Sequence, residues 1–135
     1  MVFLDASAII YLLEGDRTVR QATQEVLARL SDDQAEPVLA ISALSLLECR
    51  VHPMRNNDHQ RLKRFDDFFS DPGLITIDLT RSIVDQATEL RARHKLRTPD
   101  ALQAASCLAL GPETPFITGD KDFNKIQPLN THLVQ

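Results

Sequence analysis

The chain has 135 residues, of which 43% are hydrophobic, and a formal net charge of −4. This length and apolar content suit one compact domain with a full hydrophobic core, so we expect residues 1–135 to form a single domain. The negative charge excludes a globally basic nucleic-acid binder. It leaves open a local basic strip, or a bound cation that reverses the sign of an acidic pocket.

The cysteines favour a reducing, cytoplasmic compartment, because Cys49 and Cys107 lie in apolar segments and form no dense framework of cysteines. Asp5 interrupts the apolar start and no basic segment precedes it, so we expect no secretory signal. No apolar run approaches the ~20 residues of a membrane span, and no membrane partner is expected. The four histidines share no metal-ligand spacing.

Short apolar runs alternate with longer segments whose apolar residues recur at helical spacing. The runs predict strands at residues 2–4, 38–41, 74–77, 116–118 and 132–134. The longer segments predict helices at residues 6–13, 19–30, 43–51, 57–70, 80–97 and 98–110, with a loop at 31–37. Ser42 and Thr98 are expected to be helix N-caps, and His52-Pro53 is expected to end the third helix. This alternation predicts an α/β fold, in three layers, with helices on both faces of a parallel sheet of four to five strands.

Two aspartates follow directly on predicted strands. Asp5 ends the first strand and Asp120 ends the fourth. The carboxyl ends of parallel strands share one edge of the sheet, which is where ligands bind in open α/β folds. Asp is also a preferred helix N-cap, so each residue alone has an ordinary structural explanation.

Two further acids are expected near the same edge. Glu48 lies in an otherwise apolar helix, on the face that it shares with Ser45, and the pattern supports a solvated glutamate and a glutamate held inside for a function equally. Asp100 lies in the first turn of a helix rich in small residues, where a negative charge stabilises by ~0.3–1 kcal/mol. Four acids in one crevice would repel and raise one another's pKa, and a divalent cation relieves that repulsion. Oxygen ligands without His or Cys select Mg²⁺ or Mn²⁺.

Taken together, these segments resemble a PIN-domain ribonuclease, and most closely the VapC-type toxins of bacterial toxin–antitoxin pairs. The resemblance spans the chain and rests on D-x-S-A at the first strand, a Glu inside the helix after the second, L-R-T-P-D-A-L-x-x-A, and F-I-T-G-D-K-D-F. It implies a PIN-like fold and Mg²⁺-dependent endonucleolytic cleavage of RNA, with Mn²⁺ expected to substitute. It also implies a VapB-like antitoxin as partner, and a homodimer.

The same resemblance assigns residues to roles. Asp5, Glu48, Asp100 and Asp120 match the acidic quartet that holds the metal and performs catalysis, and Ser7 and Thr118 match small hydroxyl residues that support it. Asp122 is expected to have an auxiliary role, because the position of the fourth acid of the quartet varies within the family. Basic residues must lead the phosphate backbone to this acidic site, and the candidates are Arg50, Lys95, Arg97 and Lys121.

The motifs of two other enzyme or signalling classes are incomplete in this sequence. An aspartyl phosphotransferase would need a second acid two residues after Asp5, where Ser7 stands, and a phospho-receiver domain would need an acidic pair near the first strand. A non-catalytic PIN-like module that binds RNA or protein is the stronger alternative. Its mark would be the loss of a quartet acid, and all four are present.

Overall fold

The sheet is five-stranded and wholly parallel in the computed structural model, which describes residues 1–31 and 36–134. Its order is β3-β2-β1-β4-β5, so the first strand lies in the centre. Leu4 pairs in register with Ile117, which brings the carboxyl ends of β1 and β4 together. The strands are β1 (Val2–Leu4), β2 (Leu39–Ser42), β3 (Ile75–Ile77), β4 (Pro115–Thr118) and β5 (Asn130–Leu133). The predicted fold class is confirmed.

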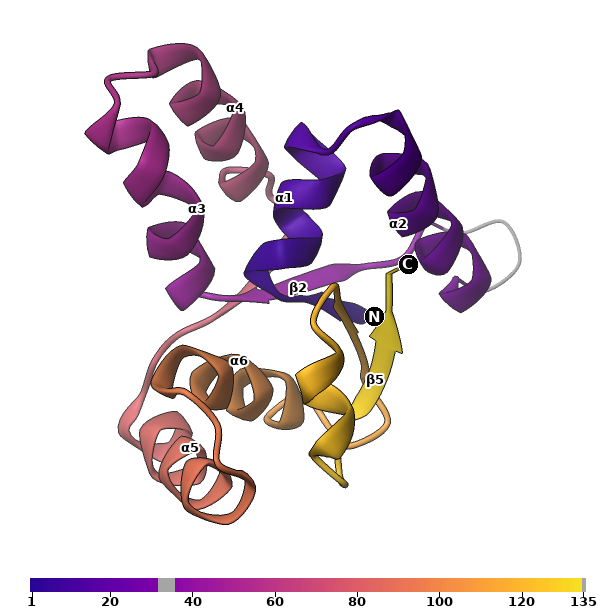
Figure 1. Cartoon of the computed structure of the whole chain (residues 1–135), viewed down its shortest axis with the longest axis vertical. Coiled ribbons are helices and arrows are strands. Elements are labelled where there is room, and N and C mark those ends of the chain that lie inside the picture. The colour runs from indigo at the N-terminus through magenta and orange to yellow at the C-terminus, as the bar shows by residue number, and fades with distance from the viewer. Residues whose placement is uncertain (32–35, 135) are drawn as a thin grey trace.

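Helices cover both faces of the sheet (Figure 1). One face carries α1 (Ala6–Glu14), α2 (Arg17–Leu30), α3 (Leu44–Arg55) and α4 (His59–Phe69). The other carries α5 (Arg81–His94), α6 (Thr98–Leu108) and the 3-10 helix η1 (Lys121–Lys125). Among the described residues, no helix is long and apolar enough to cross a membrane.

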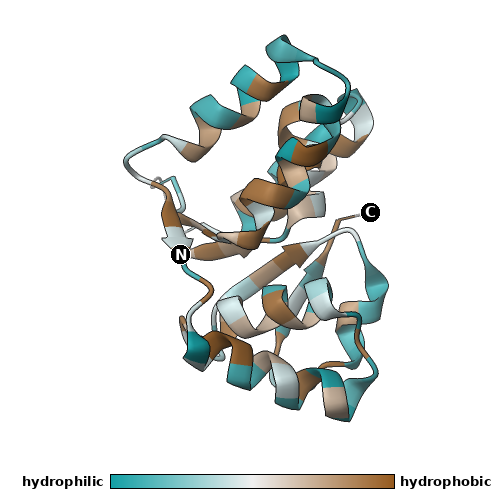
Figure 2. Ribbon diagram, turned by 90° about the vertical axis from the view of Figure 1, so that its left-hand side faces the viewer, coloured by the Kyte–Doolittle hydropathy of each residue, from teal (hydrophilic) through white to brown (hydrophobic). Residues whose placement is uncertain are grey.

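Side-chain alternation along the strands gives each face its own core. Phe3 of β1 contributes to the core beneath α5 and α6, whereas Val2 and Leu4 contribute to the core beneath α1 to α4. Figure 2 shows the two helical layers separated by the sheet, whose central strands are coloured largely as hydrophobic. The cysteines divide between the same cores, and burial raises the pKa of both thiols to about 12. Both are therefore packing residues.

The prediction that His52-Pro53 ends the third helix is wrong, because α3 continues to Arg55 with Pro53 buried inside it. Proline removes its own N–H from the helical ladder, and its ring crowds the carbonyl group four residues earlier. The N–H groups of Asn56 and Asp58 still donate to the carbonyls of His52 and Pro53. The helical turn is thus retained across the proline.

Two expected caps differ by one residue. Ser42 ends β2 and Ala43 is the N-cap of α3, although the Ser42 hydroxyl still accepts from the Leu44 N–H at 3.1 Å. Arg97 rather than Thr98 is the N-cap of α6, so Thr98 already has helical geometry. Of the loop predicted at 31–37, residues 32–35 lie outside the described residues.

Candidate active site

Asp5 is fixed at the carboxyl end of β1, where it is both a helix cap and a buried acid. Its Oδ1 accepts from the Ala8 N–H at 2.9 Å and from the Ser7 hydroxyl at 2.6 Å. Its Oδ2 accepts from the Thr118 hydroxyl at 2.5 Å. The side chain is held from the first turn of α1 and from the neighbouring strand β4, and the residue is only 5% exposed. The capping interpretation is therefore correct, but it does not account for the contact with Thr118.

Burial raises the pKa of Asp5, and this effect outweighs the hydrogen bonds from Ser7, Thr118 and Ala8, which lower it. The negative charge of Glu48 raises the Asp5 pKa further. No cation pairs with Asp5 among the hydrogen bonds and ion pairs of the described residues. A buried carboxylate without a counter-ion is costly to the fold, and such groups concentrate at functional sites.

The exit of β4 is tied to the same group. Gly119 N–H donates to the Ser7 hydroxyl at 3.0 Å, and Asp120 N–H donates to the Thr118 hydroxyl at 3.0 Å. A side chain on Gly119 would overlap the ring and hydroxyl of Tyr11, so only glycine lets this backbone approach α1. Asp120 Oδ1 accepts from the Asp122 N–H at 2.9 Å and caps η1. These contacts place Asp120 beside the end of β1.

Glu48 reaches the site from α3 through a contact with α6. Its Oε1 accepts from Gln103 Nε2 at 2.9 Å, and the same nitrogen donates to the Ser45 hydroxyl at 2.9 Å. The predicted shared face of Ser45 and Glu48 is thus the face towards α6. The sequence interpretation missed Gln103, although an amide among the small apolar residues of a buried helix was a visible signal.

Asp100 is held in a different way from Asp5. Arg97 Nε lies 3.3 Å from Asp100 Oδ2, one turn earlier in the chain. The Asp100 side chain is 18% exposed and that of Arg97 is 79% exposed. An ion pair with so exposed a partner is weak and readily exchanged.

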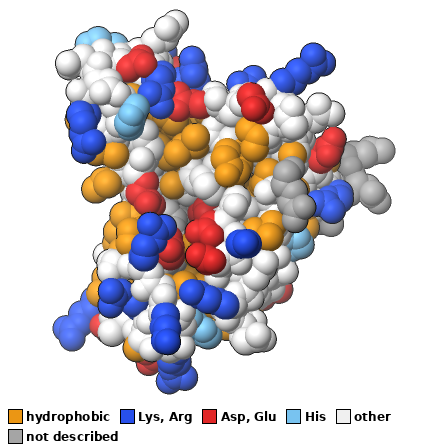
Figure 3. All heavy atoms as spheres, viewed as in Figure 1, with side chains coloured by type: hydrophobic (Ala, Val, Ile, Leu, Met, Phe, Trp, Pro, Cys, Tyr) orange, Lys and Arg blue, Asp and Glu red, His pale blue; other side chains and the backbone are white. Residues whose placement is uncertain are grey.

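The four acids meet in one cavity. Figure 3 shows acidic side chains gathered in a hollow between the two helical layers, with lysine and arginine side chains around them. The cavity has a volume of about 160 Å³. Besides Ala6 and Phe123, its lining consists of polar and charged residues: Asp5, Ser7, Glu48, Arg97, Asp100, Gln103 and Asp120.

The donor atoms of this cavity suit a divalent cation better than their spacing does. Its donors are carboxylate and carboxamide oxygens, which suit Mg²⁺ and Mn²⁺, and the Oε1 of Gln103 is buried without a partner. In the described residues, however, no three or more His, Cys, Asp or Glu side chains are grouped closely enough to hold an ion. Protein donors hold the carboxylates individually. The donor chemistry therefore suits a divalent cation, whereas the described positions of the acids do not form a ready-made coordination site.

Other predicted residues lie outside the cavity lining. Asp122 and Lys121 are exposed on η1, and Lys95 is exposed at the end of α5. Arg50 faces α4, where it pairs with Asp66 at 3.3 Å.

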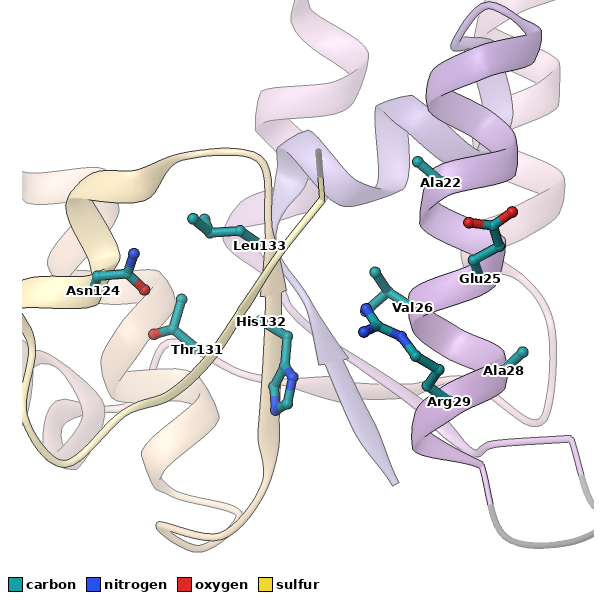
Figure 4. A pocket seen from close by; sticks show the side chains of 9 residues that line it. All are labelled: Ala22, Glu25, Val26, Ala28, Arg29, Asn124, Thr131, His132 and Leu133. Carbon is teal, nitrogen blue, oxygen red and sulfur yellow. The ribbon is translucent and has the colours of Figure 1, made fainter.

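A larger cavity, of about 950 Å³, lies between α2 and the edge strand β5 (Figure 4). Arg29 and His132 enter it from opposite sides, and burial together with the Arg29 charge lowers the pKa of His132. Glu25 is the acid in its lining, and none of the predicted site residues contributes to it. The larger of these two cavities is therefore not the one that contains the predicted acids.

The comparisons with known proteins agree with this fold. The PIN domain family matches residues 2–128. No curated protein matches the chain. A toxin–antitoxin complex from Klebsiella pneumoniae has 23% identity and a TM-score of 0.73, covering 96% of this chain and 95% of that one. VapBC2 from Rickettsia felis, bound to a DNA fragment from its promoter, has 20% identity and a TM-score of 0.75, with full coverage of both chains.

A third similar structure is VapC20 from Mycobacterium tuberculosis, described as a sarcin–ricin loop cleaving toxin. It has 19% identity and a TM-score of 0.72, covering 92% of this chain and 93% of that one. At these identities the structures establish a shared fold, while the family match extends over nearly the whole sequence. The chain belongs to the PIN-domain family.

Proposed function

We propose that the chain is a Mg²⁺-dependent endoribonuclease and the toxin of a toxin–antitoxin pair. The observation that carries the proposal is the single cavity lined by Asp5, Glu48, Asp100 and Asp120, which come from four separate elements. Four carboxylates in so small a space repel one another, and the buried one has no counter-ion among the residues that the structure describes. This arrangement is unfavourable for a purely structural site and suits a site that binds a cation.

The four acids would hold Mg²⁺, with Mn²⁺ as a substitute, and the ion would supply an activated water and charge neutralisation at the scissile phosphate. The chain's own residues prepare this site. Ser7 and Thr118 orient Asp5 from either side, and Gly119 allows Asp120 to approach the same strand end. Asp100 becomes available when Arg97 moves away.

Basic residues around the cavity are proposed to guide the RNA backbone. Arg97 lines the cavity, Lys121 follows Asp120 directly, and Lys95 lies two residues before Arg97. When Arg97 leaves Asp100, its guanidinium is free to pair with a phosphate, which it matches in a bidentate manner. Arg50 has a weaker case, because Asp66 and the Leu46 carbonyl already engage it.

An antitoxin is the proposed protein partner, in line with the toxin–antitoxin complexes that share the fold. We expect it to insert a basic side chain among the acids, as Arg97 already does beside Asp100. Co-expression with the adjacent open reading frame should yield a stable complex. Failure of any neighbouring product to bind or to protect cells would count against the toxin role.

A second copy of the chain is proposed to cover an apolar stripe on α3. Leu47, Val51 and Met54 recur at helical spacing and are 61%, 43% and 58% exposed. Such a stripe on a helix is self-complementary under two-fold symmetry. Sedimentation of the wild-type chain should give a dimer, and Leu47→Glu should give a monomer.

The alternative, a non-catalytic PIN-like module, is favoured by one observation: the acids are not already grouped around one point. Cleavage of RNA separates the two functions. Purified wild-type protein should cleave RNA with Mg²⁺ or Mn²⁺, stop in excess EDTA, and lose activity as Asp5→Asn. Undiminished cleavage in EDTA would refute the metal mechanism, and no cleavage under any condition would favour the binding module.

A further inference from the structure

Gln103 has a buried oxygen that the protein leaves unused. The residue is 3% exposed, and its Oε1 is the one buried side-chain nitrogen or oxygen in residues 1–31 and 36–134 with no hydrogen-bond partner. Buried polar atoms are nearly always paired, so an unpaired one calls for a specific explanation. Gln103 lines the acid cavity, so a group bound in that cavity is a candidate for the missing partner of Oε1.

The neighbours of Gln103 fix which way its amide group faces. Nε2 donates to Glu48 Oε1 and to the Ser45 hydroxyl, both at 2.9 Å. A carboxylate only accepts, so the nitrogen must face Glu48 and the amide cannot be reversed. Both amide protons are therefore engaged, and Oε1 is left as a free acceptor on the other side of the same planar group.

The position of this acceptor relates it to the acids. Gln103 lies three residues after Asp100 on α6, which places both side chains on one face of the helix. Mg²⁺ usually keeps several of its waters when it binds to carboxylates. Each such water has protons to donate and needs acceptors around it. Oε1 is an acceptor of this kind, and it belongs to a residue that lines the cavity.

We propose that Gln103 is a positioning residue of the metal site, holding Glu48 through Nε2 and accepting through Oε1 a hydrogen bond from a water of the bound ion. This inference rests on the proposed function, since it requires that a divalent cation occupies the acid cavity. It adds to the acidic quartet a neutral residue that fixes both an acid and the hydration of the ion. Such outer partners typically change metal affinity by ~10–100-fold when they are removed.

Two substitutions separate the donor and acceptor roles. Gln103→Met keeps the length of the side chain and removes both functions, whereas Gln103→Glu keeps acceptor oxygens and loses both donors. Ser106→Ala is the matched control, because Ser106 is a buried polar residue of the same helix whose hydroxyl donates to the Leu102 carbonyl. Mn²⁺ affinity is measured by calorimetry, after thermal melts in EDTA establish that each variant is folded.

We expect Gln103→Met to weaken Mn²⁺ binding by about tenfold or more. Gln103→Glu should weaken it less, and Ser106→Ala should bind like the wild type. Wild-type affinity in a folded Gln103→Met would overturn the proposal. Equal weakening in the Met and Glu variants would also overturn it, because only the contact between Nε2 and Glu48 would then matter.

A second measurement needs no variant and avoids the charge that glutamate adds. In wild-type protein labelled at the glutamine side-chain carbonyl carbons, the Gln103 signal should shift on addition of Mg²⁺, while those of the exposed Gln21 and Gln60 should not. An unmoved Gln103 signal in protein that binds Mg²⁺ overturns this inference alone. A wild-type chain that binds neither ion overturns both this inference and the proposed function.

Discussion

The two ends of α1 carry carboxylates in opposite situations. At the last residue of the helix, Glu14 receives two hydrogen bonds from Arg61, at 2.6 and 2.7 Å, and Arg64 lies 3.5 Å away. The bonds from Arg61 lower the pKa of Glu14. At the other end, burial raises the pKa of Asp5, which is held by hydroxyl and amide donors only.

This contrast distinguishes a structural acid from a functional one. Glu14 joins α1 to α4 and has a charge that the protein itself neutralises. Asp5 is positioned just as firmly, but no cation in residues 1–31 and 36–134 pairs with it. We conclude that the Glu14 end of α1 stabilises the fold through a neutralised charge, whereas the Asp5 end carries a buried carboxylate for which the described residues supply no counter-ion.

The largest expected effect is on catalysis at Asp5. Asp5→Asn preserves shape and capping, since Asn caps about as well as Asp. Removing the charge should lower RNA cleavage by at least ~10²-fold, the scale on which electrostatic groups of active sites act. Glu14→Gln, the matched control, should cleave RNA at the wild-type rate once folded. Comparable RNA cleavage by Asp5→Asn and Glu14→Gln would contradict the distinction between the two ends of α1.

Gly119 offers a way to disturb the Asp5 end without altering an acid. In Gly119→Ala the new methyl group would overlap the Tyr11 ring, and overpacking of this kind typically costs about 1–3 kcal/mol. Displacing this backbone also disturbs the bond from Gly119 to Ser7 and the position of Asp120. We expect lower stability in urea together with reduced cleavage. The double variant Tyr11→Ala/Gly119→Ala should recover part of the activity, and a neutral Gly119→Ala would contradict the packing argument.

Glu14→Gln should lower stability at neutral pH by about 1–2 kcal/mol, between the values typical of exposed and buried ion pairs. Because Arg61 lowers the folded pKa of Glu14, its contribution is present above the unfolded value of 4.5 and is lost as pH falls through the folded pKa.

Asp5 should behave in the opposite sense. Its folded pKa lies above the unfolded value of 3.8, so without metal it destabilises the fold as pH rises through the interval between the two. Urea unfolding in EDTA should show that Asp5 lowers the free energy of unfolding as pH rises from acidic to neutral. Asp5→Asn should remove this contribution. An unchanged pH profile in Asp5→Asn would contradict the raised pKa.

The smallest change in metal-free stability is expected at Asp120. Asp120→Asn keeps the cap of η1 and removes one of four repelling charges, so its metal-free melting temperature should rise slightly. It should also lose most of the stabilisation by Mg²⁺. Unchanged stabilisation by Mg²⁺ would exclude Asp120 from the site and make Asp122 the next residue to test.

Much of this arrangement could be predicted from the sequence. The strands, the parallel sheet and the meeting of Asp5 with Asp120 follow from apolar runs that end in acids, because a parallel sheet places such ends along one edge. The predicted end of the third helix at Pro53 is wrong because the helical hydrogen bond that a proline loses is offset by burial. That burial depends on tertiary packing. The same limit applies to Gln103. Its partner, Glu48, is set by the packing of α3 against α6, which sequence spacing does not specify.

The most direct test of the account is the change in melting temperature on addition of Mg²⁺, measured for wild type, Asp5→Asn and Glu14→Gln. A ligand at one hundred times its dissociation constant stabilises the folded state by about 2.7 kcal/mol. The account predicts equal Mg²⁺-dependent increases for wild type and Glu14→Gln, despite the lower starting temperature of the latter, and little or no increase for Asp5→Asn. An increase in Asp5→Asn as large as that of the wild type would contradict the proposal that the Asp5 carboxylate binds the metal ion.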